Sequence, residues 1–181
     1  MKRGCILVLT ILLAGFGAGA EDRHHAAEMS QDARFEFLKQ LEGTWVGDGI
    51  DGEPGGVYEF RVTAGGTAVR EIEMVGTPME MVTLYYMEGK NLVATHYCML
   101  GNQPRLMAAK RVVDDTLAFA CAGTPGNAKS HDEHHVHGWT MRLARDGKLH
   151  YSAELTQDGK VTEAPVSILT RRQQTAAAAG P

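Results

Sequence analysis

The sequence predicts an all-β protein: a roughly ten-stranded antiparallel up-and-down β-barrel with one short N-terminal helix. After Gly43 the apolar residues recur with a period of two, short turns separate the runs, and no helical pattern interrupts the series. Two of the turns, at 146–147 and 158–159, contain Asp-Gly, which favours tight antiparallel hairpins. A meander of this length leaves two exposed edges unless it closes, so a barrel is favoured over a two-sheet sandwich.

The expected elements follow from these patterns. Phe35, Leu38 and Leu41 recur every three residues and predict a short amphipathic helix, with Ser30 as a candidate N-cap and Gly43 at its end. Ten alternating runs follow, over residues 44–48, 57–62, 68–75, 81–87, 92–100, 105–113, 117–122, 134–144, 149–156 and 161–172.

The first 20 residues have the layout of a secretory signal peptide. Lys2 and Arg3 precede a short apolar stretch, and residues 18–20 are the small residues Ala-Gly-Ala. A membrane anchor is the weaker interpretation, because the apolar run is short and polar residues follow directly. We therefore expect a periplasmic or secreted protein whose mature chain has no transmembrane segment.

The rest of the chain is expected to form one domain. Residues 21–29 lack an apolar period and are predicted to be flexible, residues 30–172 form the barrel, and the alanine-rich residues 173–181 are predicted to be disordered. The formal net charge is −4 and no basic block is present, so a nucleic-acid partner is not expected. The oligomeric state is left open.

Two cysteines, Cys98 and Cys121, remain after removal of the signal peptide. In a meander one run separates their strands, which places them about 9.5 Å apart, beyond the roughly 7 Å limit between the Cα atoms of a disulfide. Free thiols are therefore expected.

At residues 41–45, Leu-Glu-Gly-Thr-Trp, the sequence resembles the calycin superfamily, which includes lipocalins, fatty-acid-binding proteins and nitrobindins. In that superfamily a Gly-x-Trp follows a short helix, and the indole packs under a basic residue from the end of the barrel. The resemblance implies that Trp45 packs under Arg171 or Arg172, with a cation–π contribution of ~0.5–2 kcal/mol.

The sequence is more similar to a family of bacterial exported calycin-like proteins. The shared motifs are Thr-His-Tyr-Cys at 95–98, Gly-Asn-Gln-Pro-Arg at 101–105 and His-Val-His at 135–137. This resemblance implies the fold over residues 35–172 and no particular activity. Nitrobindins hold haem through a histidine near the end of the barrel, but here no histidine follows His150.

Strand alternation groups the candidate site residues. His135, His137 and Trp139 share one face of their strand, while His96 and Cys98 share one face of theirs, and both faces are predicted to line the interior. Three imidazoles there suit Zn²⁺ or Cu²⁺. The alternative is that they are polar lumen residues, hydrogen-bonded to one another, to water or to a small ligand.

Two neighbouring features stay outside the predicted metal set. His131 and His134 are interpreted as part of a solvated loop, although loose metal binding there is possible. Arg105 is expected at the barrel rim, where it either binds a carboxylate or is simply solvated.

Three functions remain open. The first is binding of a small apolar or amphipathic molecule in the lumen. The expected ligand-binding residues are His96, Cys98, Arg105, His135, His137 and Trp139. The second is metal or haem binding through His96, His135 and His137, with zinc, copper or haem as the cofactor. A metal-dependent enzyme is a distant third, because no catalytic triad or paired carboxylates stand out.

Overall fold

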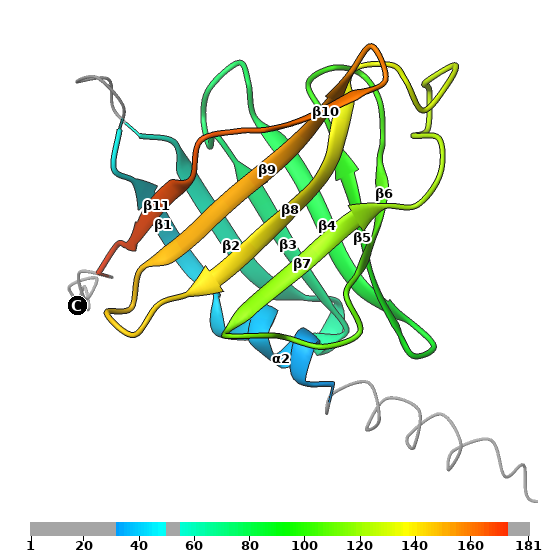
Figure 1. Cartoon of the computed structure of the whole chain (residues 1–181). Coiled ribbons are helices and arrows are strands. Elements are labelled where there is room, and N and C mark those ends of the chain that lie inside the picture. Colours follow the sequence, from blue (N-terminus) through cyan, green and yellow to red (C-terminus); the bar gives the residue numbers. More distant parts are fainter. Residues whose placement is uncertain (1–31, 50–54, 174–181) are drawn as a thin grey trace, which may run out of the picture.

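One antiparallel sheet closes into a barrel, as Figure 1 shows for the computed structural model, which describes residues 32–49 and 55–173. The sheet has eleven strands in the order β10-β9-β11-β1-β2-β3-β4-β5-β6-β7-β8, and β8 also pairs with β9. That last pairing closes a ten-stranded barrel and confirms the predicted fold class. The expected signal peptide, the N-terminal segment up to residue 29 and most of the tail lie outside the described residues.

The elements are short and follow one another closely. They are α2 (Ala33–Gln40), β1 (Gly43–Gly47), β2 (Val57–Thr63), the 3₁₀ turn η1 (Ala64–Gly66), β3 (Ala68–Glu73), β4 (Met81–Glu88), β5 (Asn91–Tyr97), β6 (Arg105–Ala108), β7 (Thr116–Cys121), β8 (His135–Leu143), β9 (Leu149–Gln157), β10 (Lys160–Glu163) and β11 (Ser167–Arg171).

The last expected run, residues 161–172, forms two strands instead of one. β10 and β11 pair with successive parts of the same edge of β9. Pro165 lies in the interruption between them, where its missing N–H removes a ladder hydrogen bond. β10 is therefore an additional strand, and β11 is the one that joins β9 to β1 in the barrel.

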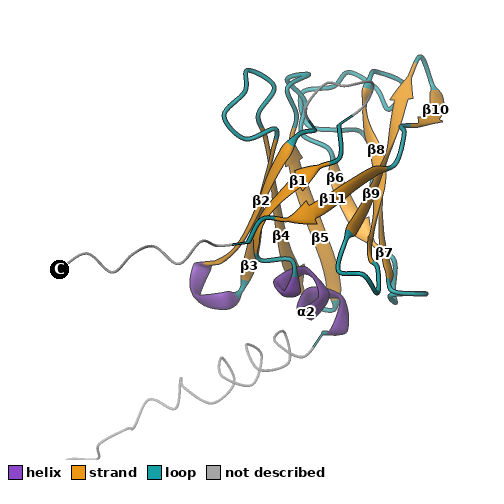
Figure 2. Cartoon of the chain, turned by 90° about the vertical axis from the view of Figure 1, so that its left-hand side faces the viewer, coloured by secondary structure: helices purple, strands orange, loops and turns teal. Residues whose placement is uncertain are grey.

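The helix α2 lies across one end of the barrel, as Figure 2 shows. Its N-cap is Asp32, whose side chain accepts a hydrogen bond from the Arg34 backbone N–H, whereas the predicted cap Ser30 lies outside the described residues. Phe35 and Leu38 are buried, so the apolar face of α2 packs into the barrel core as the three-residue spacing predicted.

The barrel core follows the strand alternation. On β3, buried Val69, Glu71 and Glu73 alternate with half-buried neighbours, so these three side chains point inward. The inward apolar side chains of the other strands form one contiguous cluster that includes Trp45, Phe60, Tyr85, Leu106, Phe119, Trp139, Tyr151 and Leu169. The interior is thus lined by large aromatic groups and, on β3, by two carboxylates.

The closed end is held by Trp45 and Arg171, which meet as the calycin resemblance implied. The Arg171 guanidinium lies 4.2 Å from the centre of the Trp45 ring. The same guanidinium donates hydrogen bonds to the carbonyls of Gln40, the last residue of α2, and of Glu42, two residues further on. The Trp45 indole N–H donates to Leu41 O at 2.8 Å. One side chain therefore fixes the end of the helix to the first and last strands of the barrel.

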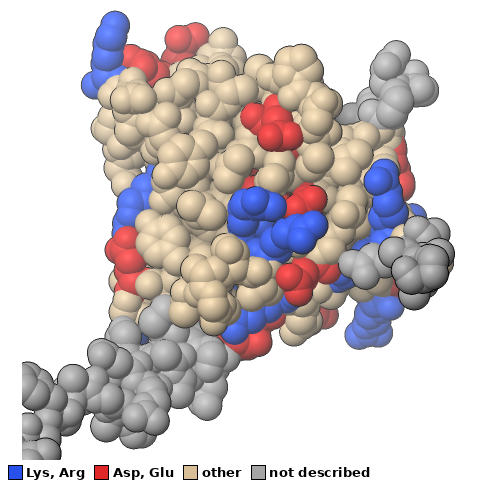
Figure 3. Space-filling view, turned by 180° about the vertical axis from the view of Figure 1, so that it is seen from behind, with Lys and Arg blue, Asp and Glu red and all other residues tan. Residues whose placement is uncertain are grey.

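The outer wall carries charges of both signs. Figure 3 shows basic and acidic side chains next to one another in the middle of one face, among mostly uncharged ones. On the outer face of β2 and β3, Glu59 pairs with both Arg61 and Arg70. Among the described residues, no helix is long and apolar enough to cross a membrane.

Arg171→Ala is expected to lower the free energy of unfolding by about 1–2 kcal/mol, because it removes the cation–π contact and two hydrogen bonds to helix-end carbonyls. Urea denaturation measures this change. The matched control is Arg172→Ala, since Arg172 is exposed and only its backbone N–H bonds to the barrel, at Thr44 O. Equal effects of the two substitutions would contradict the assigned role of Arg171.

Candidate functional site

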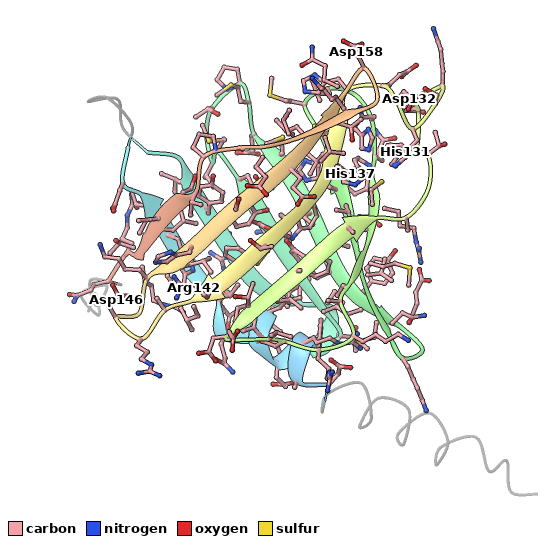
Figure 4. All side chains as sticks on the ribbon, in the orientation of Figure 1. His131, Asp132, His137, Arg142, Asp146 and Asp158 are labelled. Atoms are coloured by element: carbon pink, nitrogen blue, oxygen red, sulfur yellow. The ribbon has the colours of Figure 1, made fainter. Side chains whose placement is uncertain are left out.

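The candidate site lies at the end of the barrel opposite α2. β7 ends there at Cys121, β8 begins there at His135, and residues 122–134 connect them. Figure 4 shows His131 and His137 near each other at this end, with Asp132 and Asp158 on adjacent loops. Because α2 and the Trp45–Arg171 contact occupy the other end, this is the end at which ligands can reach the barrel.

The connection between β7 and β8 is tied to the barrel at three places. Gln103 and Gly126 form an isolated antiparallel bridge, and the buried Asn102 side chain donates to His134 O at 2.8 Å. The Asp132 carbonyl accepts a hydrogen bond from the Gly159 N–H at 3.0 Å. Asn102 and Gln103 belong to the Gly-Asn-Gln-Pro-Arg motif, so this motif holds the loop that carries His131 over the barrel rim.

Three potential metal ligands converge under this loop. One ligand atom each from Cys121, His131 and His135 lies within 4.8 Å of the other two. The imidazole of His137 is adjacent, with ring centres 5.4 Å from His131 and 5.9 Å from His135. A thiol from β7 and two imidazoles, from the loop and β8, thus converge, and the imidazole of His137 lies beside this group without belonging to it.

The tautomer of His135 leaves its second nitrogen free to bind a metal. Its Nδ1 lies 2.7 Å from the carbonyl oxygen of Glu133, and a carbonyl only accepts, so Nδ1 carries the hydrogen. Nε2 is therefore the bare nitrogen, and it is buried without a hydrogen-bond partner. A backbone carbonyl that orients an imidazole in this way is a common partner of metal-bound histidines. Burial and the neighbouring imidazoles lower the pKa of His135.

The other polar atoms of the cluster also have few or no hydrogen-bond partners. Nδ1 of His131 and Nδ1 of His137 are both buried without a hydrogen-bond partner. The Cys121 thiol makes a single contact of 3.3 Å with the Gly123 carbonyl, and burial raises its pKa. Buried polar atoms ordinarily have partners, so several orphaned nitrogens in one cluster call for a ligand.

A β-bulge changes how β8 presents its histidines. The pairing with β9 shifts register between Val136 and Gly138, so His137 has no partner across the strand. Val136 joins the hydrophobic core, while His135 is fully buried and His137 is half-buried. The uninterrupted alternation that was expected from His135 to Trp139 is therefore wrong. Val136 pairs with Leu155 and points to the core, so the adjacent His135 does not line the interior as predicted but lies on the other face of β8, buried beside His131.

His96 lies in a different cluster from the other predicted metal ligands. Its Nδ1 is 2.9 Å from Thr83 Oγ1 and 3.7 Å from Glu73 Oε1, and its ring lies 6.0 Å from that of Trp139. Burial lowers the pKa of His96 to about 4, so the ring is neutral near pH 7. Among the described residues, the group of converging metal ligands does not include His96.

Two buried carboxylates stand beside His96 in the barrel interior. The Tyr85 hydroxyl donates to Glu71 Oε2 at 2.5 Å, whereas Glu71 Oε1 has no partner. Burial, followed by the charge of Glu73, raises the pKa of Glu71 well above its usual range, and burial raises the pKa of Glu73 to about 7. A pair of carboxyl groups therefore retains protons in a water-poor interior.

Aromatic rings surround this acid pair. Tyr85 contacts Phe119 and Trp139 at ring-centre distances of 5.3 and 6.1 Å, and Tyr58 contacts Tyr151 at 5.8 Å. Tyr58 also lines a hollow of about 400 Å³ at the open end, between β1, β2 and β11. A second hollow lies on the outer wall, lined by Ala118, Ala120, Thr140, Ser152 and Glu154 among others.

The other predicted ligand-binding residues are placed as follows. Trp139 lies inside, and its indole N–H is buried without a partner. Cys98 is half-buried, with its thiol 4.0 Å from the Met81 sulfur, and both Cys98 and Cys121 are free thiols as expected. Arg105 points away from the interior and pairs with Glu88, because it alternates with the inward Leu106.

The site residues predicted from the sequence did not include His131, Glu71 or Glu73, although the alternation of Glu71 and Glu73 with Arg70 and Ile72 indicated that a charged side chain on this run could face inward. The spacing of His131, His135 and His137 was visible, but a loop histidine reaches a strand only if the loop folds back, which the tertiary anchors decide. Glu71 and Glu73 alternate along one run, and period two allowed them to face inward without requiring it.

Comparison with known proteins gives a limited result. No family model matches the chain. A segment of 74 residues, 41% of the chain, is 35% identical to the cytosolic Fe-S cluster assembly factor nar1 of Aspergillus fumigatus, and it covers 12% of that protein. The chain therefore matches only about an eighth of the length of this curated relative.

Asn102→Ala is expected to speed amide hydrogen exchange in residues 126–134 and to cost about 1–2 kcal/mol, since it removes the hydrogen bond to His134 O. Mass spectrometry of exchanged peptides measures the first effect and urea denaturation the second. Gln103→Ala is the control, because its side chain bonds only to Gly101 O and the backbone bridge to Gly126 survives. Unchanged exchange in Asn102→Ala would refute the anchoring role.

Glu73→Gln is expected to stabilise the protein more at pH 8 than at pH 5. The folded pKa of Glu73 is raised to about 7 from 4.5, so its favourable contribution is complete below 4.5 and is lost as pH rises through about 7. The stability difference between variant and wild type should shift by about 2 kcal/mol across this range, as urea unfolding at both pH values measures. The same difference at both pH values would exclude the raised pKa.

Proposed function

We propose that the protein is an exported metal-binding β-barrel protein that holds one zinc or copper ion at the barrel rim through Cys121, His131 and His135. The observation that carries the proposal is the convergence of a thiol and unpartnered imidazole nitrogens within 4.8 Å of one another. The free Nε2 of His135, left bare by the hydrogen bond to Glu133 O, is already in the form that binds metal.

The donor set selects the class of metal. Imidazole nitrogen and thiolate sulfur suit zinc and copper, whereas magnesium and calcium prefer oxygen. Tetrahedral zinc would bring these atoms to separations of roughly 3.3–3.6 Å from one another, given its bond lengths to nitrogen and sulfur. Because the present separations are within 4.8 Å, small side-chain rotations are enough to close the site.

The role of His137 determines whether the proposed metal site has three or four protein ligands. Its buried, unpartnered Nδ1 lies next to the cluster and can supply a fourth ligand, which would give a closed binding site. With three protein ligands only, a water molecule would occupy the fourth position, as in metal-dependent enzymes. We favour the four-ligand arrangement and therefore binding rather than catalysis.

Haem and iron–sulfur clusters fit the donors less well. Haem needs an axial ligand beside an open apolar slot, whereas here several donors converge on one point. Iron–sulfur clusters are usually held by about four thiolates. The described residues contain two cysteines, Cys98 and Cys121, which belong to different clusters.

Export and a calycin relationship are parts of the same proposal. The layout of residues 1–20 supports export, because it combines a basic start, an apolar stretch and small residues. The Arg171 guanidinium over Trp45 and the helix across the closed end support a calycin-like origin. An exported barrel with a rim metal site would bind the ion in the periplasm or outside the cell.

A second function, binding of a small molecule in the barrel, is favoured by a separate observation. The hollow of about 400 Å³ at the open end lies within the size range of small-molecule pockets. Glu71, His96 and Trp139 have buried polar atoms without partners in the interior, and Tyr58, which lines the hollow, lies opposite Glu73 in the ladder.

Titration of the purified full-length mature protein with Zn²⁺ is expected to show one tight site per chain, measured by calorimetry and elemental analysis. His131→Ala and His135→Ala should each weaken binding by roughly 100-fold or more, because each removes a ligand. With Co²⁺, wild type should show a sulfur-to-cobalt charge-transfer band that Cys121→Ser abolishes. A copper titration distinguishes the two candidate ions.

His134→Ala is the matched control, because His134 is exposed, lies in the same segment and uses only its backbone carbonyl to hold the loop. It should bind zinc like wild type. Stoichiometric zinc in both His131→Ala and His135→Ala at unchanged affinity would overturn the proposed site.

A further inference from the structure

Glu71 and Glu73, the acid pair in the barrel, have no Lys or Arg partner among the described residues. Across the ladders, Glu71 lies between Phe60 and Thr83, and Glu73 lies between Tyr58 and Met81. All four neighbours are uncharged. Among the described residues the one ion pair of this cluster is Glu73 with His96, and that imidazole is neutral near pH 7. A buried carboxylate without a counter-charge is costly, so the interior favours a guest that carries a positive charge.

Unpartnered polar atoms mark the place where such a guest would bind. Glu71 uses one oxygen for the Tyr85 hydroxyl and leaves Oε1 free, although the side chain is completely buried. His96 Nε2 and Trp139 Nε1 are likewise buried and free, and their rings lie 6.0 Å apart. The Trp139 ring also meets Tyr85 at 6.1 Å, so these three atoms belong to one continuous cluster.

The walls suit an organic cation with an apolar body. Tyr85, Phe119 and Trp139 form a mutually contacting group of rings, and Tyr58 and Tyr151 form a second group. Aromatic faces attract ammonium groups, and ionised carboxylates form strong hydrogen bonds with their N–H donors. A metal ion is a poor match, because the cluster offers few oxygens and many rings.

The interior is approached through the hollow at the open end. Its lining includes Gly47, Tyr58, Met74, Ser167 and Leu169. Tyr58 is directly opposite Glu73 in the ladder, and burial, followed by the charges of Glu73 and Glu71, raises the pKa of Tyr58 to about 12. Tyr58 is therefore the residue that lines the hollow of about 400 Å³ and also neighbours the acid pair.

We infer that the barrel binds a small primary amine with an aromatic or aliphatic body, whose ammonium group is held by Glu71 and Glu73 and whose body packs against Tyr85, Phe119 and Trp139. This inference rests on the proposed small-molecule binding in the barrel and is independent of the metal site. The free Glu71 Oε1 receives an ammonium N–H, and the ligand charge replaces the missing counter-charge of the acid pair.

The test compares three probes of the same shape on the full mature chain. Calorimetric titration is carried out with 2-phenylethylamine, 2-phenylethanol and phenylacetate. The amine is expected to bind at least about tenfold more tightly than the alcohol, and the carboxylate should not bind, because like charges repel in the buried site. Quenching of tryptophan fluorescence places the bound probe, since Trp139 lies in the cluster.

Variants assign the charge recognition to the acid pair. Glu71→Gln keeps the size of the side chain and an oxygen that accepts from the Tyr85 hydroxyl. This substitution should lower the affinity for the amine by about tenfold and leave the affinity for the alcohol unchanged. Glu154→Gln is the control, because Glu154 lines the outer-wall hollow and should leave the amine affinity unchanged. A cooperative urea unfolding transition shows that each variant is folded.

The outcomes distinguish recognition of an amine from small-molecule binding in general. Equal binding of amine and alcohol overturns the amine assignment and leaves small-molecule binding standing. Absence of binding by all three probes overturns both. An unchanged amine affinity in Glu71→Gln also overturns the assignment, and if that variant does not fold, the comparison of the three probes on wild type decides.

Discussion

The pairing of β8 with β9 is the interaction on which the rest of the structure depends. It joins the two ends of the sheet along eight residue pairs and leaves the wall without a free edge there. Closure removes the inner face of every strand from water at once. The large apolar side chains are then favourable in the interior, and each carboxylate or imidazole facing inward becomes a group that needs a partner.

The two ends of the barrel have different chemistry because only one of them is filled. Helix α2 and the Arg171–Trp45 contact occupy one end, where the Arg171 guanidinium and the Trp45 indole N–H are both hydrogen-bonded. At the other end, the loop between β7 and β8 folds over the rim, and several buried nitrogens lack partners. The proposed metal site is therefore at the rim and not at the helix end.

The two candidate sites use the same physical rule for different ligands. At the rim, nitrogen and sulfur donors converge, and the proposed ligand is a cation that forms coordinate bonds. Deeper inside, two carboxyl groups lie among aromatic rings, and the proposed ligand is an organic cation. His96 belongs to the second group because it lies opposite Thr83 on β4, which lies opposite Glu71 on β3, so the three side chains are neighbours on the same wall of the barrel.

The sequence by itself determined the fold class and the short N-terminal helix, since period-two and period-three patterns and short turns act over a few residues. The contact of Trp45 with a C-terminal arginine was implied by the resemblance to calycins, and His135 and His137 were predicted as candidate site residues. Only the tertiary structure decided that His131 joins them, that His96 leaves them and that Arg105 faces outward. The physical reason is that a one-residue bulge or a folded-back loop redirects side chains without leaving a local pattern in the sequence.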